Sequence, residues 1–333
     1  MSIPASATAE AGAGATESPA LTGVIGAGDA PGAPHRWRAA VRRFLRHPAG
    51  MTGLALTLLV VVTGALADVI SPGDPFRTAG DPLLAPSGTH WMGTDNLGRD
   101  VFDAVVHGAR TSMIVVLGVS ALASVIGLAI GLVAGYRGGW ADDLLMRLTE
   151  LFQSVPRFFL VLLIVALFGA GLDNLIYVLA FTSWPTLARV SRAEVLSVRD
   201  RTYVEAARSV GATDWRIAMR HVLPNVLPTA LVVIALTGSR IILLEASLSF
   251  LGLGDPTVMS WGYLVSNANR FLRTAWWMSV FPGMAIAIAV LGINLMSDAL
   301  NDVLASYSQS RAKRRRRFGR LRRREPALAD AGV

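Results

Sequence analysis

Long apolar runs alternate with shorter polar segments along the 333-residue chain. Six runs are present, at residues 51–70, 112–136, 158–172, 175–190, 226–250 and 278–300. Because about twenty helical residues cross the roughly 30 Å hydrocarbon core of a bilayer, this pattern predicts six transmembrane helices and an all-α membrane protein. The third and fourth runs have 15 and 16 residues, a length that also suits a re-entrant hairpin.

The polar segments divide the chain into five expected parts. Residues 1–35, rich in Ala, Gly, Pro, Ser and Thr, form a disordered tail. The other parts are a basic flank with the first transmembrane helix (36–75), an outer loop (76–110), a core of five transmembrane helices with a cytosolic loop at 191–225 (111–306), and a basic cytosolic tail (307–333). Small residues in the second apolar run predict close helix packing: Gly118, Gly127, Gly131 and Gly135.

Composition and charge agree with a membrane location. The chain is 53% apolar and 16% charged, against about 45–50% and roughly 25% in soluble domains, which excludes an ordinary soluble enzyme. With the N-terminus in the cytoplasm, 25 of the 31 Lys and Arg residues fall in cytosolic segments, five fall in outer segments, and Arg240 lies within a span. This bias predicts that both termini are cytoplasmic.

The arginine-rich segment 311–324 has two interpretations. Its ten basic residues would suit electrostatic binding to RNA or DNA. They also follow the last apolar run, where basic residues fix topology and attract anionic lipid. The sequence has no zinc-finger spacing and no aromatic-interleaved RNA-binding motif, so the membrane interpretation is favoured and no nucleic-acid partner is expected.

Catalytic and metal-binding motifs are missing from the sequence. It has no cysteine, no HExxH and no GxSxG, and its single lysine, Lys313, is not part of a Gly-rich phosphate loop. One polar group in the outer loop resembles a ligand site, but its irregular spacing favours a structural loop: His90, Asp95, Asn96, Arg99 and Asp100. We therefore expect no enzymatic activity and no bound metal.

The cytosolic loop has the signals of two short helices. Thr202 and Glu205 have the spacing of a capping box, which predicts a helix that begins at Thr202. Gly211 suits the left-handed residue that closes such a helix. Thr213 is placed to cap a second helix from residue 214 to about 221, and Pro224 is expected to limit its continuation.

This loop resembles the EAA loop, which marks the membrane subunits of binding-protein-dependent ATP-binding-cassette (ABC) importers. The matching positions are Glu205-Ala206-Ala207, Gly211 and Leu223-Pro224, whereas His221 stands where the general pattern has isoleucine. Three further stretches are similar to the second permease subunit of the dipeptide, oligopeptide and nickel branch: His90–Phe102, Gly108–Met113 and Glu245–Gly254. The similarity covers about residues 36–306.

The resemblance implies a permease of the type I ABC importer fold in a bacterial cell membrane. It implies that the chain forms a pathway for peptides, that the EAA loop seats in a separate ATPase, and that ATP and Mg²⁺ bind to that ATPase and no cofactor binds to this chain. The implied partners are a homologous permease in a heterodimer, one or two ATPase subunits, an extracytoplasmic solute-binding protein and lipid. The substrate remains open among dipeptides, longer peptides and nickel chelates.

Two ionisable residues in the fifth apolar run leave alternatives open. Arg240 and Glu245 would each cost at least about 2.5–3.5 kcal/mol at the centre of a bilayer, so they are expected to face protein or water. Each is either a structural charge satisfied by a neighbouring helix or a residue that lines the translocation pathway. A stand-alone ion-coupled transporter or channel is the alternative function, but only the importer explains the EAA-type loop.

Overall fold

The computed structural model describes residues 41–329, with side chains for residues 41–303. The expected disordered tail, residues 1–35, and the side chains of the basic tail lie outside this part. The described residues are helical and contain no β-strand, only the isolated bridges Thr78–Arg99 and Thr94–Asp100. The all-α class is therefore confirmed.

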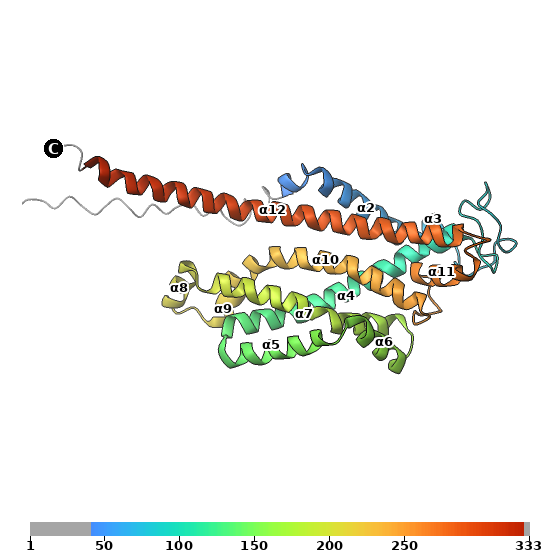
Figure 1. Ribbon diagram of the computed structural model, residues 1–333, viewed down its shortest axis with the longest axis horizontal. Coiled ribbons are helices and arrows are strands. Elements are labelled where there is room, and N and C mark those ends of the chain that lie inside the picture. Colours follow the sequence, from blue (N-terminus) through green and yellow to red (C-terminus); the bar gives the residue numbers. More distant parts are fainter. Residues whose placement is uncertain (1–40, 330–333) are drawn as a thin grey trace, which may run out of the picture. The chain divides into compact units, whose positions relative to one another are not determined.

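Besides the helical residues 41–44, eleven α-helices lie in the described part (Figure 1). They are α2 (Pro48–Ala65), α3 (Ala67–Ile70), α4 (Val101–Arg137), α5 (Gly139–Ser154), α6 (Arg157–Phe168), α7 (Leu172–Arg199), α8 (Thr202–Ser209), α9 (Asp214–Ile217), α10 (Leu223–Phe250), α11 (Trp261–Ala268) and α12 (Trp277–Ala329). A π-helical turn, η1 (Ala218–Val222), joins α9 to α10, and a 3₁₀ turn, η2 (Asn269–Phe271), follows α11.

Each of the six apolar runs lies largely within a helix or within two adjacent helices. Four described segments are long and apolar enough to cross a membrane, Pro48–Ala65, Val101–Arg137, Asp214–Phe250 and Trp277–Val303, and the bent pair α5–α6 would make a fifth. Helix α7 is 28 residues long, but its second half carries Arg189, Arg192 and Glu194. The exact count of six spans therefore stays a prediction.

One expected boundary is wrong, and one helix was not expected. Helix α4 begins at Val101, so residues 101–110 are helical and do not belong to the outer loop. The reason is Asp100, whose Oδ1 accepts hydrogen bonds from the backbone N–H of Phe102 (2.8 Å) and Asp103 (3.4 Å) and so caps the helix. The third apolar run is preceded by another helix, α5, and the chain bends by 82° between α5 and α6. Pro156 lies at this break, where it precedes the first residue of α6.

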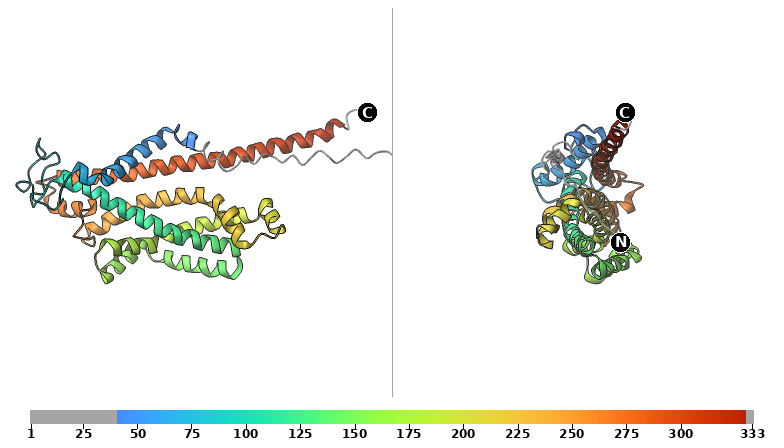
Figure 2. Two further views of the ribbon diagram at one scale, coloured as in Figure 1. Left: turned by 180° about the vertical axis from the view of Figure 1, so that it is seen from behind. Right: turned by 90° about the vertical axis from the view of Figure 1, so that its left-hand side faces the viewer.

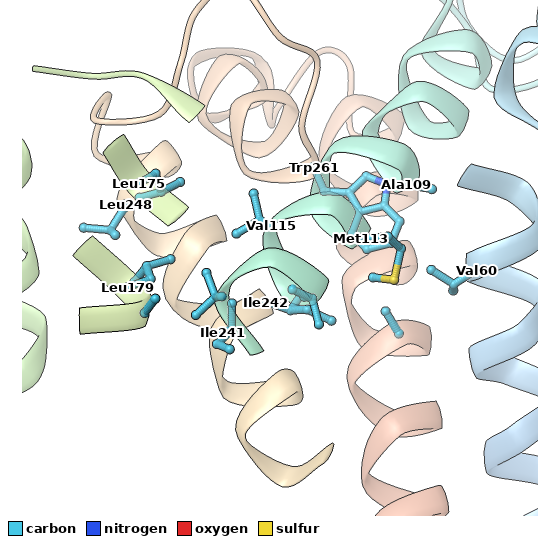
Figure 3. Packing of buried hydrophobic residues seen from close by; sticks show 14 of the residues in the cluster. Val60, Ala109, Met113, Val115, Leu175, Leu179, Ile241, Ile242, Leu248 and Trp261 are labelled. Carbon is cyan, nitrogen blue, oxygen red and sulfur yellow. The ribbon is translucent and has the colours of Figure 1, made fainter. Parts of the chain in front are cut away.

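The main core lies where α4, α7 and α10 pack against one another, as the front and rear views show (Figures 1 and 2). Figure 3 shows its side chains, among them Val115 from α4, Leu179 from α7 and Ile241 from α10, which are all fully buried. Trp261 of α11 extends this core, and its indole Nε1 donates to the Val105 carbonyl oxygen at 2.9 Å. Helix α12 packs along α2 and α10.

The expected close packing of the second apolar run is confirmed on three of its four glycines. A Cβ atom at Gly127, Gly131 or Gly135 would lie 2.6–2.9 Å from its nearest atom on α7, and at Gly131 that atom is the backbone oxygen of Ala188. Since real Cβ atoms do not approach so closely, only glycine lets α4 and α7 come this near to each other.

The outer segment between α3 and α4 is held by internal hydrogen bonds. Asp95 Oδ1 accepts from the backbone N–H of Leu97 (2.7 Å) and Arg99 (2.9 Å), and His90 Nδ1 lies 2.7 Å from Asp100 Oδ2. No group of three or more acidic or histidine side chains suitable for a metal ion occurs in the described residues. These contacts are those of a structural loop, the interpretation that the sequence favours.

The two tryptophans before the last span have different environments. Tryptophans just before a span commonly anchor a helix at the membrane interface, which is one interpretation of Trp276 and Trp277. Trp276 is 53% exposed, but Trp277 is buried and its Nε1 donates to the Thr94 carbonyl oxygen at 3.1 Å. The interface interpretation is therefore wrong for Trp277, which ties the outer segment to α12.

Candidate functional site in the loop between α7 and α10

A Schellman motif shapes the tip of the loop. Gly211 has φ +83°, the left-handed conformation that the sequence predicts. The N–H of Gly211 donates to the Arg208 carbonyl oxygen (3.0 Å), and the N–H of Ala212 donates to that of Ala207 (3.1 Å). These two bonds satisfy the last carbonyl groups of α8 and turn the chain sharply into α9.

The start of α8 differs from the sequence interpretation. The helix does begin at Thr202, but the N-cap residue is Arg201 and no side chain caps it. The capping box of Thr202 and Glu205 is therefore not formed, because Thr202 already has helical geometry as the first residue of the helix. Thr213 does occupy the N-cap position of α9, again without a side-chain hydrogen bond.

The sequence predicts that Pro224 limits the second helix, but the helix continues past this residue. Helix α9 passes through the π-turn η1 directly into α10, and Pro224 lies in the first turn of α10. In η1 the N–H of Leu223 donates to the Ala218 carbonyl oxygen, five residues back. A π-turn widens the helix, which makes room for a proline ring that would clash in an unbroken α-helix.

A small apolar cluster fixes the loop on the ends of α4 and α7. Its fully buried members are Val195, Val198, Val204, Ile217, Val222 and Val226. Leu128, Leu132 and Tyr136 of α4 pack against them. The Tyr136 hydroxyl donates to Asp214 Oδ1 at 2.8 Å, which links the end of α4 to the start of α9. The loop is therefore attached to two long helices at its base.

The tip of the loop exposes large apolar side chains. Val210 is 86% exposed and Trp215 is 70% exposed, while Glu205, Ala206 and Gly211 are also exposed beside them. Ala207 and Leu223 are half-buried, and Pro224 is exposed at the start of α10. We call Glu205, Ala206, Val210, Gly211 and Trp215 the tip surface. An exposed apolar patch on a fixed turn is typical of a protein docking site.

Val210 and Trp215 are functional candidates that the EAA pattern does not include. The EAA pattern selects Glu205, Ala206, Ala207, Gly211, Leu223 and Pro224, and the structure brings the first four together at the tip. Leu223 and Pro224 lie apart from the tip, at the base of the loop beyond η1. Two large apolar residues within a polar segment were the available signal, since Val210 and Trp215 flank Gly211 in the sequence.

Glu245 lies in the interior of the chain. It is 2% exposed, and its carboxylate accepts hydrogen bonds from Ser249 of α10 (2.9 Å) and Ser112 of α4 (3.5 Å). Ser260, which caps α11, is a third serine within hydrogen-bonding reach. Glu245 thus joins α4, α10 and the start of α11, an arrangement that suits the structural interpretation better than the pathway interpretation.

Replacing Glu245 is expected to destabilise the fold in a way that depends on the substitute. Glu245→Ala leaves a cavity and removes the partner of two buried serines, a loss of about 2–4 kcal/mol that lowers Tm by several degrees. Glu245→Gln keeps an acceptor of the same shape and is expected to retain most of the stability. Thermal unfolding of the purified protein measures both, with exposed Ser247→Ala as the unchanged control. Equal Tm losses for Ala and Gln would contradict the role of the hydrogen bonds.

Arg240 lies on α10 and remains exposed in this chain. It comes near Arg157, the first residue of α6, although 83 positions separate them in the sequence. Arg157 is half-buried and its Nη2 donates a hydrogen bond to the Ser183 hydroxyl of α7. Arg240 stands out in the sequence as a charge within an apolar run, whereas Arg157 counts there among the 25 basic residues of the cytosolic segments. No sequence signal links the two positions.

Comparison with known proteins places these features in context. Residues 127–306 match the family described as binding-protein-dependent transport system inner membrane component, and residues 35–88 match the N-terminal transmembrane domain of oligopeptide transport permease C. A putative peptide transport system permease of Brucella abortus is 41% identical over 79% of this chain and 89% of its own length. The glutathione transport system permease GsiD of Pectobacterium atrosepticum is 36% identical over 80% of this chain and 90% of its own length.

A solved structure shows a similar fold. The inward-facing methionine ABC transporter MetNI aligns with a TM-score of 0.50 and 20% sequence identity, over 60% of this chain and 96% of its own. At this level of identity the likeness concerns the fold alone. The EAA-like loop lies within the family match, and the stretch that contains Glu245 and Ser249 lies there as well.

Proposed function

Because this chain belongs to the inner membrane component family of binding-protein-dependent transport systems, we propose that it forms part of the peptide pathway of an ABC importer and that its tip surface docks on a separate ATPase. The exposed, apolar tip surface carries this proposal. It stands on a Schellman turn whose base is packed against α4 and α7, so a force on the tip is transmitted to helices that cross the membrane.

The chemistry of the tip surface supports docking on a protein. An exposed aromatic side chain is typical of the centre of an interface, and Trp215 provides one in a loop whose exposed residues include the small Ala206 and Gly211. The same loop has several exposed arginines, including Arg208 and Arg216. ATP and Mg²⁺ then bind to the partner, and this chain contributes no catalytic group.

Charge supports an orientation with the tip surface and both termini in the cytoplasm. Seven arginines lie between residues 189 and 220, and ten basic residues lie in 311–324, while segments at the opposite ends of the helices carry few. In this orientation the outer segment and α11 face the solute-binding protein. The membrane is the bacterial inner membrane in which the family resides.

We propose peptides as the substrate class because the relatives of this chain are named as peptide or glutathione permeases. One relative is a putative peptide permease, another transports glutathione, and residues 35–88 match a domain of oligopeptide permeases. Exposed apolar side chains along the membrane-spanning helices, such as Leu117, Leu163 and Leu243, leave surface for lipid and for a homologous permease. We propose that this second permease is a related chain, in a heterodimer.

Replacing Trp215 tests the docking proposal. Trp215→Ala is expected to weaken binding of the ATPase by about 10- to 100-fold, because an exposed tryptophan in an interface commonly contributes 2 kcal/mol or more. The side chain has little packing inside this chain, so the permease itself is expected to keep its Tm. Co-purification and titration of the ATPase subunits against the detergent-solubilised permease measure the affinity.

Trp91 provides a matched control. It is 69% exposed, close to the value for Trp215, but precedes α4 at the end opposite to the tip surface. Trp91→Ala is therefore expected to leave ATPase binding unchanged. If both variants bind the ATPase as tightly as the wild type, the tip surface is not the docking site.

A further inference from the structure

Two arginines and the start of a helix lie near the break between α5 and α6. Arg157 is the first residue of the 12-residue helix α6, where the helix dipole is positive. Arg240 of α10 lies at the level of Ser183 of α7, to which Arg157 donates a hydrogen bond, and α7 packs against α10. The Nε–H of Arg157 is buried and has no hydrogen-bond partner among the described residues, although Nη2 of the same side chain donates to Ser183.

These groups lie near the middle of the membrane-crossing length of α7 and α10. The start of α7 and the loop after α10 are at the same end, since the Leu172 N–H donates to Asp255 Oδ2 at 3.1 Å. Burial raises the pKa of Asp255, but hydrogen bonds from Thr257 and Leu172 outweigh it, so that this pKa lies below its usual value. Ser183 and Arg240 are each about 15 Å from that end along α7 and α10, at 1.5 Å per residue. That depth is half of a hydrocarbon core of roughly 30 Å.

No carboxylate of the described residues pairs with Arg157 or Arg240. The described ion pairs are His47–Asp302, His90–Asp100, Arg110–Asp68, Arg192–Asp142 and Arg199–Asp200. Glu245, on the same helix as Arg240, is instead enclosed by serines and is 2% exposed. Arginines at mid-membrane depth face water or an anionic partner, so these two residues are suited to an anionic solute.

We propose that Arg157 and Arg240 bind the free C-terminal carboxylate of a peptide as it passes through the membrane. This inference rests on the proposed function and adds the chemical group that the pathway recognises. Two guanidinium groups offer paired N–H donors that match a carboxylate, and Ser183 holds one of them in place. Broken helices whose N-termini face an anionic group of the substrate recur at transport sites.

An acid of the second permease would also satisfy these arginines, and it would keep the site neutral in every state. Arg240 is exposed from this chain, so a solute that moves along its surface has access to it. The fixed acid is the competing outcome of the test below.

The test compares two peptides that differ only at the C-terminus. The complete transporter with its companion subunits is reconstituted in liposomes, and uptake of trialanine and trialanine amide is measured at concentrations that saturate the binding protein. Arg240→Gln is expected to lower uptake of trialanine by about 10- to 100-fold, the loss of one charge-assisted hydrogen bond, and to change uptake of the amide by less than about twofold. Arg157→Gln is expected to act in the same direction.

Controls separate this inference from the proposed function. Arg147→Gln removes an exposed arginine of α5 and is expected to leave both uptake rates unchanged. All samples contain the same solute-binding protein. Its preference for one of the two peptides therefore cancels when the uptake rate of a variant is divided by that of the wild type for each peptide. If Arg240→Gln does not assemble, Arg240→Lys, which keeps the charge and loses the paired donors, is measured in the same ratio.

Three other results of these experiments would contradict either the carboxylate site or the proposed function. An equal loss of both peptides in the Arg240 variants would overturn the carboxylate site. Separation of the two permease subunits on purification of these variants would also overturn it, by showing that the arginine pairs with an acid of the partner. A wild-type complex that imports no peptide would instead refute the proposed function.

Discussion

Replacing Gly211 by valine is expected to uncouple transport from ATP hydrolysis. Gly211 has φ +83°, and a β-branched residue in this conformation costs about 1–2 kcal/mol or more. No atom lies within 4 Å of the position of its Cβ, so the cost is purely conformational and the turn relaxes by changing its direction. The tip surface then meets the ATPase at another angle, and peptide uptake per ATP hydrolysed should fall by about 5- to 30-fold.

The measurement is uptake and ATPase activity of the same reconstituted complex. Gly169→Val is the matched control, because Gly169 has φ +93° and equally open surroundings but lies at the end of α6, away from the tip surface. The backbone strain at Gly169 is at least as large, because its φ of 93° and ψ of 158° lie in a region that essentially only glycine adopts. If the two variants lose the same fraction of uptake per ATP, the effect comes from strain in general and the coupling role of the turn is wrong.

Replacing Gly131 by alanine is expected to destabilise the whole bundle. A single methyl group at this position would lie 2.6 Å from both the Ala188 carbonyl oxygen and the Ser191 Cβ, and 3.0 Å from the Arg192 nitrogen. Two of these are backbone atoms of α7, which cannot move aside alone, so α4 and α7 must separate. Overpacking of this kind costs about 1–3 kcal/mol, and Tm should fall by several degrees.

Gly283→Ala is the control for the same chemical change. Gly283 lies in α12 with no atom within 4 Å of its Cβ position, so alanine fits there and favours the helix. Thermal unfolding in detergent compares the two variants. An unchanged Tm for Gly131→Ala would show that α4 and α7 are less tightly packed than their geometry indicates.

Hydropathy alone predicts most of the long helices, because a bilayer span must be both helical and apolar. It misses α5, in which Asp142, Arg147 and Glu150 interrupt the apolar positions. It also misses the first turns of α4, because that start depends on a side-chain hydrogen bond from Asp100 and not on a change of polarity. The glycines of the second apolar run do predict close packing of α4, because the absence of a side chain is enough to let another helix approach.

The site is predicted in part. Gly211 is found from sequence because a left-handed residue leaves a strong local signal, whereas the exposure of Val210 and Trp215 depends on which side chains the core covers. The prediction of a capping box is wrong because the spacing of Thr202 and Glu205 shows which hydrogen bonds could form and does not show which residue is the N-cap. The approach of Arg157 to Arg240 arises only when α6, α7 and α10 pack together, and no local pattern contains it.

The π-turn between α9 and α10 has a consequence for how the chain tolerates change. Residues 214–250 form one uninterrupted helical rod of 37 residues, roughly 55 Å long, that carries Trp215 near one end and Arg240 in the other half. Since each α-helical residue turns by about 100°, deleting one residue between Leu223 and Arg240 would rotate Trp215 relative to Arg240 by more than a quarter turn. The number of residues in that α-helical part therefore sets the angular phase between the two ends of the rod, whereas the wider π-turn holds more residues per turn and should tolerate the loss of one residue better.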